Sequence, residues 1–402
     1  MLAQHPERKE IARYLLSRGL DRPPDEGAAG DRAMPMLRMP ARTGRARAGA
    51  RAAKHVIAFP EGLAPTPQPI DPAPGPDAAL PRADVVVITW TADETDALAE
   101  VFTPGHSRAK WYRYARGFDT YKSKIRAGAP ARNAGCLGSY FPTQIGTQRV
   151  LAMKSELHLN QDGISELDDH GHSTGRATLP VKDFFLQIIA ETQAGVVLTI
   201  GTAGAVFDDF GLGDVVVTRA AKFRCRQEFR NEPFNNKRYT SRWDIPTTHF
   251  ATAEKLMKSL ERDLREPPVG PPTTDYAEAT LQPPTVRHPR IRLDGRDMKA
   301  NHPILTTDYF EYGTTANRLD RFGSAVEMGD AALGLACSEL PDPPRWAVVR
   351  NMSDPVINGD LPAKQTYHLN EQTTWAVAFY TAYGKYTSVM GALATWAVIA
   401  GL

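Results

Sequence analysis

The chain has 402 residues, of which 42% are hydrophobic and 23% charged, and its formal net charge is +2. This composition is typical of a soluble protein with a hydrophobic core, and so small a net charge argues against general nucleic-acid binding. Its three cysteines form neither a zinc-binding spacing nor a disulfide framework. No apolar run approaches the ~18 residues of a membrane span, and the first residues lack the apolar core of a signal peptide. We therefore expect a cytoplasmic protein that binds no membrane and no specific nucleic acid.

The first 81 residues differ in composition from the rest. Residues 7–19 predict a short amphipathic helix, residues 37–54 contain six Lys or Arg and no acid, and residues 60–81 contain eight prolines. A proline-rich stretch neither pairs in a sheet nor continues a helix, so it is either an extended linker or a chain wrapped on a surface. We predict an N-terminal extension, residues 1–81, followed by one domain, residues 82–402. We expect the basic part of the extension to be a solvated tail, or to bind a protein partner or acidic lipid.

Beyond residue 82, continuous apolar runs alternate with helical segments. Such runs are typical of strands buried on both faces, so the alternation predicts the α/β class. The predicted strands are residues 83–89, 196–200, 214–218 and 346–349; the predicted helices are residues 93–102, 180–191, 249–266, 325–340 and 370–402. Residues 267–303, rich in Pro, Arg and Asp, predict a surface insertion.

Three motifs follow or open these elements. Residues 198–206 read LTIGTAGAV and lead into GDVVV at residues 213–217, while residues 325–332 read AVEMGDAA and residues 348–354 read VVRNMSD. A small-residue turn after a strand lets backbone approach a ligand closely, and strand ends are where open α/β sheets bind ligands. Taken singly, each motif also fits an ordinary tight turn or the acidic first turn of a helix.

In this order, the motifs resemble the nucleoside phosphorylase/nucleosidase superfamily over about two-thirds of the chain. The resemblance is nearest to methylthioadenosine/adenosylhomocysteine nucleosidases and to the ATP nucleosidases of bacterial antiphage defence. It implies a three-layer α/β/α fold with a central mixed, twisted sheet, a homo-oligomer, and cleavage of a purine–ribose bond without a cofactor. Histidines and aspartates at residues 158–172 match no standard metal spacing, so we expect no metal.

The resemblance also assigns roles to individual residues. Asp354 would protonate the leaving base as general acid, and Glu94 would activate water. Phe310 would stack on the purine and Ser353 would orient Asp354. The expected substrate-binding residues are Thr202, Ala203, Gly204, Phe310, Glu327, Met328, Asp330 and Ser353.

One position departs from the family pattern. The family usually reads Glu-Met-Glu, and its second acid grips the ribose hydroxyls, but this chain has Gly329 there and an acid at Asp330. One residue along a helix is a rotation of ~100°. The choice between ribose and deoxyribose therefore stays open.

The nucleophile is predicted to be water. Family phosphorylases often carry an arginine where this chain has Thr199, and the Asp93-Glu94 pair would repel phosphate. Both features favour hydrolysis. The alternatives are a phosphate-dependent phosphorylase and a non-catalytic nucleotide sensor or assembly subunit, and the Gly329 departure is the best support for the latter.

Basic segments suggest a phosphorylated substrate. Residues 108–126 hold seven Arg or Lys against one acid, and residues 219–238 hold seven against two. A 5′-phosphate or triphosphate calls for such charge, whereas a plain nucleoside does not. We expect a purine nucleotide such as ATP, release of adenine, and phosphate binding by Lys222 and Arg224, with a solvated surface or a subunit contact as the alternative.

Overall fold

The computed structural model describes residues 57–260 without residue 208, and residues 275–276, 279–280, 288–293, 302–309, 311, 318–354 and 371–402. In this part of the chain, 13 strands form one mixed sheet. They are β1 Thr66–Pro67, β2 Val85–Thr89, β3 Tyr112–Tyr114, β4 Gly138–Ile145, β5 Gln148–Ser155, β6 Val196–Ala205, β7 Val215–Thr218, β8 Ala220–Phe223, β9 Arg238–Thr240, β12 Ile291–Leu293, β13 Ile304–Thr306, β14 Ala325–Glu327 and β15 Arg345–Asp354. A separate pair joins β10 Asp275–Tyr276 to β11 Ala279–Thr280.

The helices of the described part are α2 Ala92–Phe102, α3 Phe118–Lys122, α4 Pro130–Ala134, α5 Leu159–Asp162, α6 Pro180–Thr192, α7 Phe250–Ser259, α8 Ala331–Ser338 and α9 Glu371–Ala400. Two short 3₁₀ turns, η1 Arg108–Lys110 and η3 Leu319–Arg321, complete the list. No helix among these residues has the length and apolar character that crossing a membrane requires.

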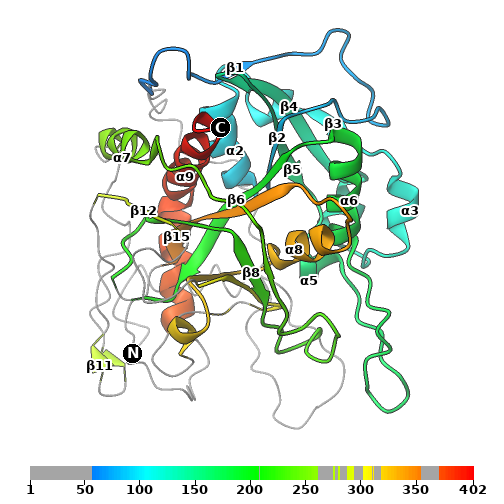
Figure 1. The fold of residues 1–402 in the computed structure, drawn as a ribbon. Coiled ribbons are helices and arrows are strands. Elements are labelled where there is room, and N and C mark those ends of the chain that lie inside the picture. Colours follow the sequence, from blue (N-terminus) through cyan, green and yellow to red (C-terminus); the bar gives the residue numbers. More distant parts are fainter. Residues whose placement is uncertain are drawn as a thin grey trace, which may run out of the picture.

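β6 is the centre of the sheet. It pairs in parallel with β2 at its first half and with β15 from Val196 to Gly204, and β14 joins its last residues in antiparallel register. β5 extends the sheet beyond β2, and β7 and β12 extend it beyond β15. Because β2, β6 and β15 run in parallel, their carboxyl ends meet at one edge (Figure 1).

Helices cover both faces of this sheet. Successive residues of β2 alternate between two apolar clusters: Val86 and Ile88 pack on the side of α6 and α8, while Val85 and Val87 pack on the side of α2, α7 and α9. This period of two is what a strand buried on both faces requires. The fold is therefore the three-layer α/β/α arrangement around a mixed, twisted sheet that the resemblance predicts (Figure 1).

The proline-rich segment is wrapped on the domain. β1 pairs with β4, the backbone N–H of Ile70 donates to the Tyr112 hydroxyl at 2.7 Å, and Trp396 donates from its ring to the Leu63 carbonyl at 2.8 Å. Of the two possibilities left by its composition, described residues 57–81 thus take the wrapped one. The helix predicted at residues 7–19 and the basic stretch at residues 37–54 lie outside the described residues.

Two predicted elements need correction. Residues 325–327, expected as the start of a helix, form strand β14, because they find backbone partners in β13 and β6; the helix begins only at Ala331. Within the expected surface insertion, residues 291–293 form β12 and pair with β7 inside the main sheet. Both errors come from pairings between distant segments, which local pattern does not reveal.

Candidate active site

Glu94 lies at the start of α2, directly after β2. It forms a capping box with Thr91, whose backbone N–H donates to Oε2 of Glu94 at 2.9 Å. Oε1 turns the other way and accepts from the backbone N–H and the hydroxyl of Thr202 on β6, at 2.8 and 2.9 Å. Helix α2 and strand β6 therefore hold the two oxygens of one buried carboxylate.

The environment of Glu94 favours its charged form. Burial alone would raise the pKa of Glu94, but the Arg350 guanidinium and hydrogen bonds from Thr91 and Thr202 outweigh it and leave the pKa below its usual value. At neutral pH the group is an ionised base.

Asp354 ends β15, and a bulge aims its side chain. Met352 lies opposite Ala203 and Asp354 opposite Gly204, so Ser353 is the extra residue. Residues in register point to the same face of a sheet, and Thr202, two residues before Gly204, faces the same way. If Ser353 were paired in an even ladder, Asp354 would lie opposite Ala205 and face the α6–α8 layer.

Asp354 is 9% exposed, and burial raises the pKa of its carboxyl to about 7. Its Oδ1 has no hydrogen-bond partner among the residues that the structure describes. At neutral pH, a carboxyl group with this pKa is protonated for a substantial part of the time, whereas Glu94 is ionised.

The two carboxyl groups meet at the same end of β6. Glu94 bonds Thr202, and Asp354 stands opposite Gly204, two residues further. Alternate residues of a strand are about 7 Å apart. The structure thus brings the two predicted catalytic residues to one place; their chemical roles stay predictions.

Arg350 connects these groups to the acidic turn. It is buried on β15, forms a two-pronged ion pair with Asp330 at 2.6 and 2.7 Å, and donates to Glu327 at 3.2 Å. Its guanidinium lies 4.8 Å from the ring centre of Trp90. Burial, followed by the charge of Asp330, raises the pKa of Glu327. One cation therefore stabilises several buried carboxylates, including Glu94.

Close packing explains why the first motif has glycine at positions 201 and 204. A Cβ on Gly201 would lie 2.2 Å from Nη1 of Arg350 and 2.8 Å from Oε1 of Glu94. Gly204 is also tight, since its Cβ would lie 3.0 Å from Cγ1 of Val326. At Gly329 a Cβ would meet only ordinary contacts, with Trp90 at 3.4 Å as the nearest.

The other predicted substrate-binding residues lie around this point with different degrees of access. Asp330 is fully buried and both its oxygens accept from Arg350, so the pair already occupies the acid that follows Gly329. Ala203 lies in the apolar cluster of the α6–α8 side, Ser353 is buried at the bulge, and Met328 is half-buried. Phe310 lies outside the described residues.

The predicted phosphate ligands flank the site. Arg224 follows β8, and its backbone N–H donates to Thr306, whose hydroxyl donates to Glu327. The Arg224 guanidinium is paired with Glu311 at 2.9 Å and is itself buried. Lys222 is half-buried on β8, with its Nζ 6.0 Å from the ring centre of Phe322.

Sequence reasoning gave no role to four residues that the structure places here. Arg350 lies inside the motif of residues 348–354, four residues before Asp354, and this spacing is the signal that marks it. Trp90 directly follows β2, and its ring lies 6.0 Å from that of His158, whose pKa burial lowers to about 4. Tyr380 of α9 lies 3.3 Å from the Thr91 hydroxyl, and no motif marks it. The described residues contain no group of three His, Cys, Asp or Glu that could hold a metal.

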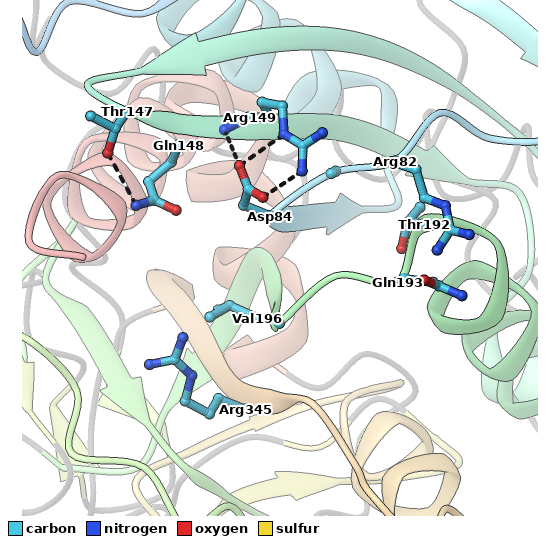
Figure 2. A pocket seen from close by; sticks show the side chains of 11 residues that line it. Arg82, Asp84, Thr147, Gln148, Arg149, Thr192, Gln193, Val196 and Arg345 are labelled. Atoms are coloured by element: carbon cyan, nitrogen blue, oxygen red, sulfur yellow. Dashed lines mark hydrogen bonds and ion pairs between the residues drawn. The ribbon is translucent and has the colours of Figure 1, made fainter.

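The hollow drawn in Figure 2 lies at the other edge of the sheet. Its volume is about 600 Å³, and it is lined by residues at the amino ends of the same strands, including Arg345, Val196 and the Asp84–Arg149 ion pair (Figure 2). It is separate from the carboxyl-end site. We therefore do not assign substrate binding to it.

The model of the phosphorylase superfamily matches residues 184–378, whereas no curated protein matches the sequence. Among solved structures, futalosine hydrolase of Helicobacter pylori is 13% identical, with 79% of this chain and 97% of that chain covered and a TM-score of 0.42. The 5′-methylthioadenosine/S-adenosylhomocysteine nucleosidase of Neisseria meningitidis is 14% identical, with 79% and 99% covered and a TM-score of 0.40.

These structural likenesses are too distant to carry an argument about substrate. The family match spans the first motif, β14, α8 and the end of β15. It confirms the family that the order of the motifs predicts. Residues 184–378 of the chain thus match the phosphorylase superfamily.

Proposed function

We propose that the protein is an N-ribosyl hydrolase that releases a free purine base. The observation that supports this is a pair of buried carboxyl groups at one end of β6 whose pKa values are shifted in opposite directions. Such divergence is how one site supplies both an acid and a base at neutral pH.

The chemistry follows from that divergence. When the bond between the sugar and the purine breaks, its electron pair stays on the base, and the proton of Asp354 neutralises that charge. The sugar carbon becomes oxocarbenium-like and takes up a water molecule. Glu94, already ionised, accepts the proton of that water. The products are the free base and a sugar with a new hydroxyl.

The finer part of the proposal concerns substrate and setting. We propose that the substrate is a purine nucleotide, specifically ATP, from which adenine is released. We also propose that the protein acts as a homo-oligomer in cytoplasmic antiphage defence and that its N-terminal extension binds a protein partner. The basic segments support a phosphorylated substrate. Because Arg224 is paired with Glu311, a phosphate group there would have to compete with that carboxylate, so Lys222 is the more accessible cation.

The test uses purified full-length protein in phosphate-free buffer. It is incubated separately with ATP, AMP, adenosine and methylthioadenosine, and free base is measured by chromatography. We expect base without added phosphate, and most from the phosphorylated substrates. Base that appears only after phosphate is added would replace hydrolysis by phosphorolysis. Nucleotide binding without base release, equal in wild type and Asp354→Asn, would indicate a sensor.

A further inference from the structure

A tyrosine from the last helix lies at the start of α2. The hydroxyl of Tyr380 on α9 is 3.3 Å from the hydroxyl of Thr91, the residue that caps α2. Helices α2 and α9 pack side by side on one face of the sheet (Figure 1). A partly buried phenol hydroxyl generally finds a hydrogen-bond partner, and here that partner is a helix cap.

Gly384, one turn further along α9, leaves room for the ring of Tyr380. A Cβ on Gly384 would lie 3.3 Å from two atoms of the Tyr380 ring, tighter than ordinary contacts. Glycine inside a helix is destabilising relative to alanine. The position of the Tyr380 ring gives this buried glycine a packing reason.

Thr91 passes the contact on to Glu94. Its hydroxyl accepts from the backbone N–H of Glu94 at 3.3 Å, and its own N–H donates to the Glu94 carboxylate at 2.9 Å. Tyr380 therefore contacts one of the three residues that donate to Oε2 of Glu94; the other two donors are the Thr89 hydroxyl and the backbone N–H of Trp90. The pKa of Tyr380 is raised mainly by burial, then by the charge of Glu94 and more weakly by that of Asp354. The phenol therefore stays neutral.

We propose that Tyr380 is a positioning residue that holds Glu94, through Thr91, in the orientation in which it takes a proton from water. The inference rests on the proposed function for its kinetic consequence, but its structural claim stands apart from it. Tyr380 contributes a hydroxyl to the cap from outside α2. The groups that face Glu94 from other elements are Thr89 from β2, Arg350 from β15, Thr202 from β6, His158 before α5 and Tyr380 from α9. Asp93, next to Glu94, also acts on Tyr380 and raises its pKa.

The first arm of the test needs no enzymatic activity. Carboxyl-labelled Glu is titrated by NMR in wild type, Tyr380→Phe and Tyr386→Phe; Tyr386 is on the same helix and packs against Gly213. Because the Thr91 hydrogen bond lowers the pKa of Glu94, loosening the cap should raise that pKa in Tyr380→Phe and leave it unchanged in Tyr386→Phe. Gly384→Ala, which displaces the ring and keeps the hydroxyl, should behave like Tyr380→Phe. An unchanged Glu94 pKa in both Tyr380→Phe and Gly384→Ala overturns the inference.

The second arm is kinetic. Tyr380→Phe should lower kcat about 2- to 10-fold, the size of one lost hydrogen bond, and leave KM nearly unchanged. The acidic limb of the rate–pH profile should shift to higher pH. Thr91→Val should have a similar effect, and the double variant should lose little more than either single one. Additive losses would mean that Tyr380 does not act through Thr91. If wild type releases no base at all, the proposed function fails, and the NMR arm still decides the role of Tyr380.

Discussion

Two edges of one sheet treat their carboxyl groups in opposite ways. At the amino ends of β2, β6 and β15, Asp84 lies by the open hollow and accepts three hydrogen bonds from Arg149, which hold its pKa below the usual value. At the carboxyl ends of the same strands, Asp354 is buried, and its pKa rises to about 7. Pairing with a cation makes the first a structural ion pair. Asp354 has no cation beside it among the described residues, so burial favours its protonated form.

The arginines of β15 show the same contrast. Arg345 begins the strand, is exposed, and has its guanidinium 5.7 Å from the ring centre of Trp243. Arg350, five residues on, is buried and donates to Asp330, Glu327 and the Thr202 carbonyl. The position along one strand, rather than the residue type, decides which charge belongs to the site.

The largest expected effect separates the two aspartates. Asn keeps the shape of Asp but donates no carboxyl proton, so Asp354→Asn should lower the rate of base release by about 10²–10⁴. Asp84→Asn should leave the rate unchanged. Single-turnover base release measured by chromatography checks both. Comparable losses in the two variants would break the contrast between the edges.

The two arginines provide the next comparison. Arg350→Met leaves Asp330 and Glu327 buried without their cation, which should cost about 3–5 kcal/mol of unfolding free energy. Arg345→Met, at the exposed edge, should change it little. Urea unfolding monitored by fluorescence measures the difference. Equal midpoints for the two variants would contradict the buried network.

Two glycines test the packing around Glu94. Gly201→Ala forces a methyl group against Arg350 and Glu94, so we expect a loss of about 1–3 kcal/mol in stability together with reduced activity. Gly329→Ala meets only ordinary contacts and should be tolerated in unfolding experiments. A fully active and stable Gly201→Ala would show that the backbone moves away easily.

The pH dependence tests the protonation states of the two carboxyl groups. The protonated form of Asp354 is needed, so kcat/KM should fall about tenfold per pH unit above about 7. On the acid side, activity should persist to pH values below the usual range of Glu, because the pKa of Glu94 is lowered. A rate–pH profile measured under kcat/KM conditions tests both limbs.

Stability provides the control for the same group. The pKa of Asp354 is higher in the folded than in the unfolded chain, so its contribution to folding is complete below pH 3.8 and is lost as pH rises through about 7. Asp354→Asn should therefore match wild type near pH 4 and be the more stable of the two at pH 8. The reverse order would mean that the carboxylate finds a partner on folding.

The sequence predicts those parts of the fold that depend on local pattern. Strands β2, β7 and β15 were found because continuous apolar runs mark strands buried on both faces. β4 and β5 carry mixed faces and gave no such signal. Residues 201–205, which the sequence predicts as a turn, continue β6 because β14 and β15 supply backbone partners from 120 or more residues away.

The site was predictable to the extent that family motifs mark single positions. Glu94 and Asp354 could be named in this way, but Arg350 could not be given a role, since a charge on a buried strand makes sense only once its carboxylate partners are known. Tyr380 belongs to no motif, and only the packing of α9 on α2 brings it to the cap.

The bulge at Ser353 carries a consequence for sequence change along β15. Deletion of Ser353 would place the aspartate directly after Met352, where an even ladder again sets it opposite Gly204 and on its present face. Insertion of one residue before the aspartate would do the same only if the bulge widened to hold it. Lineages that carry an aspartate after this strand but lack the extra residue should therefore keep the proposed acid on the side of Glu94.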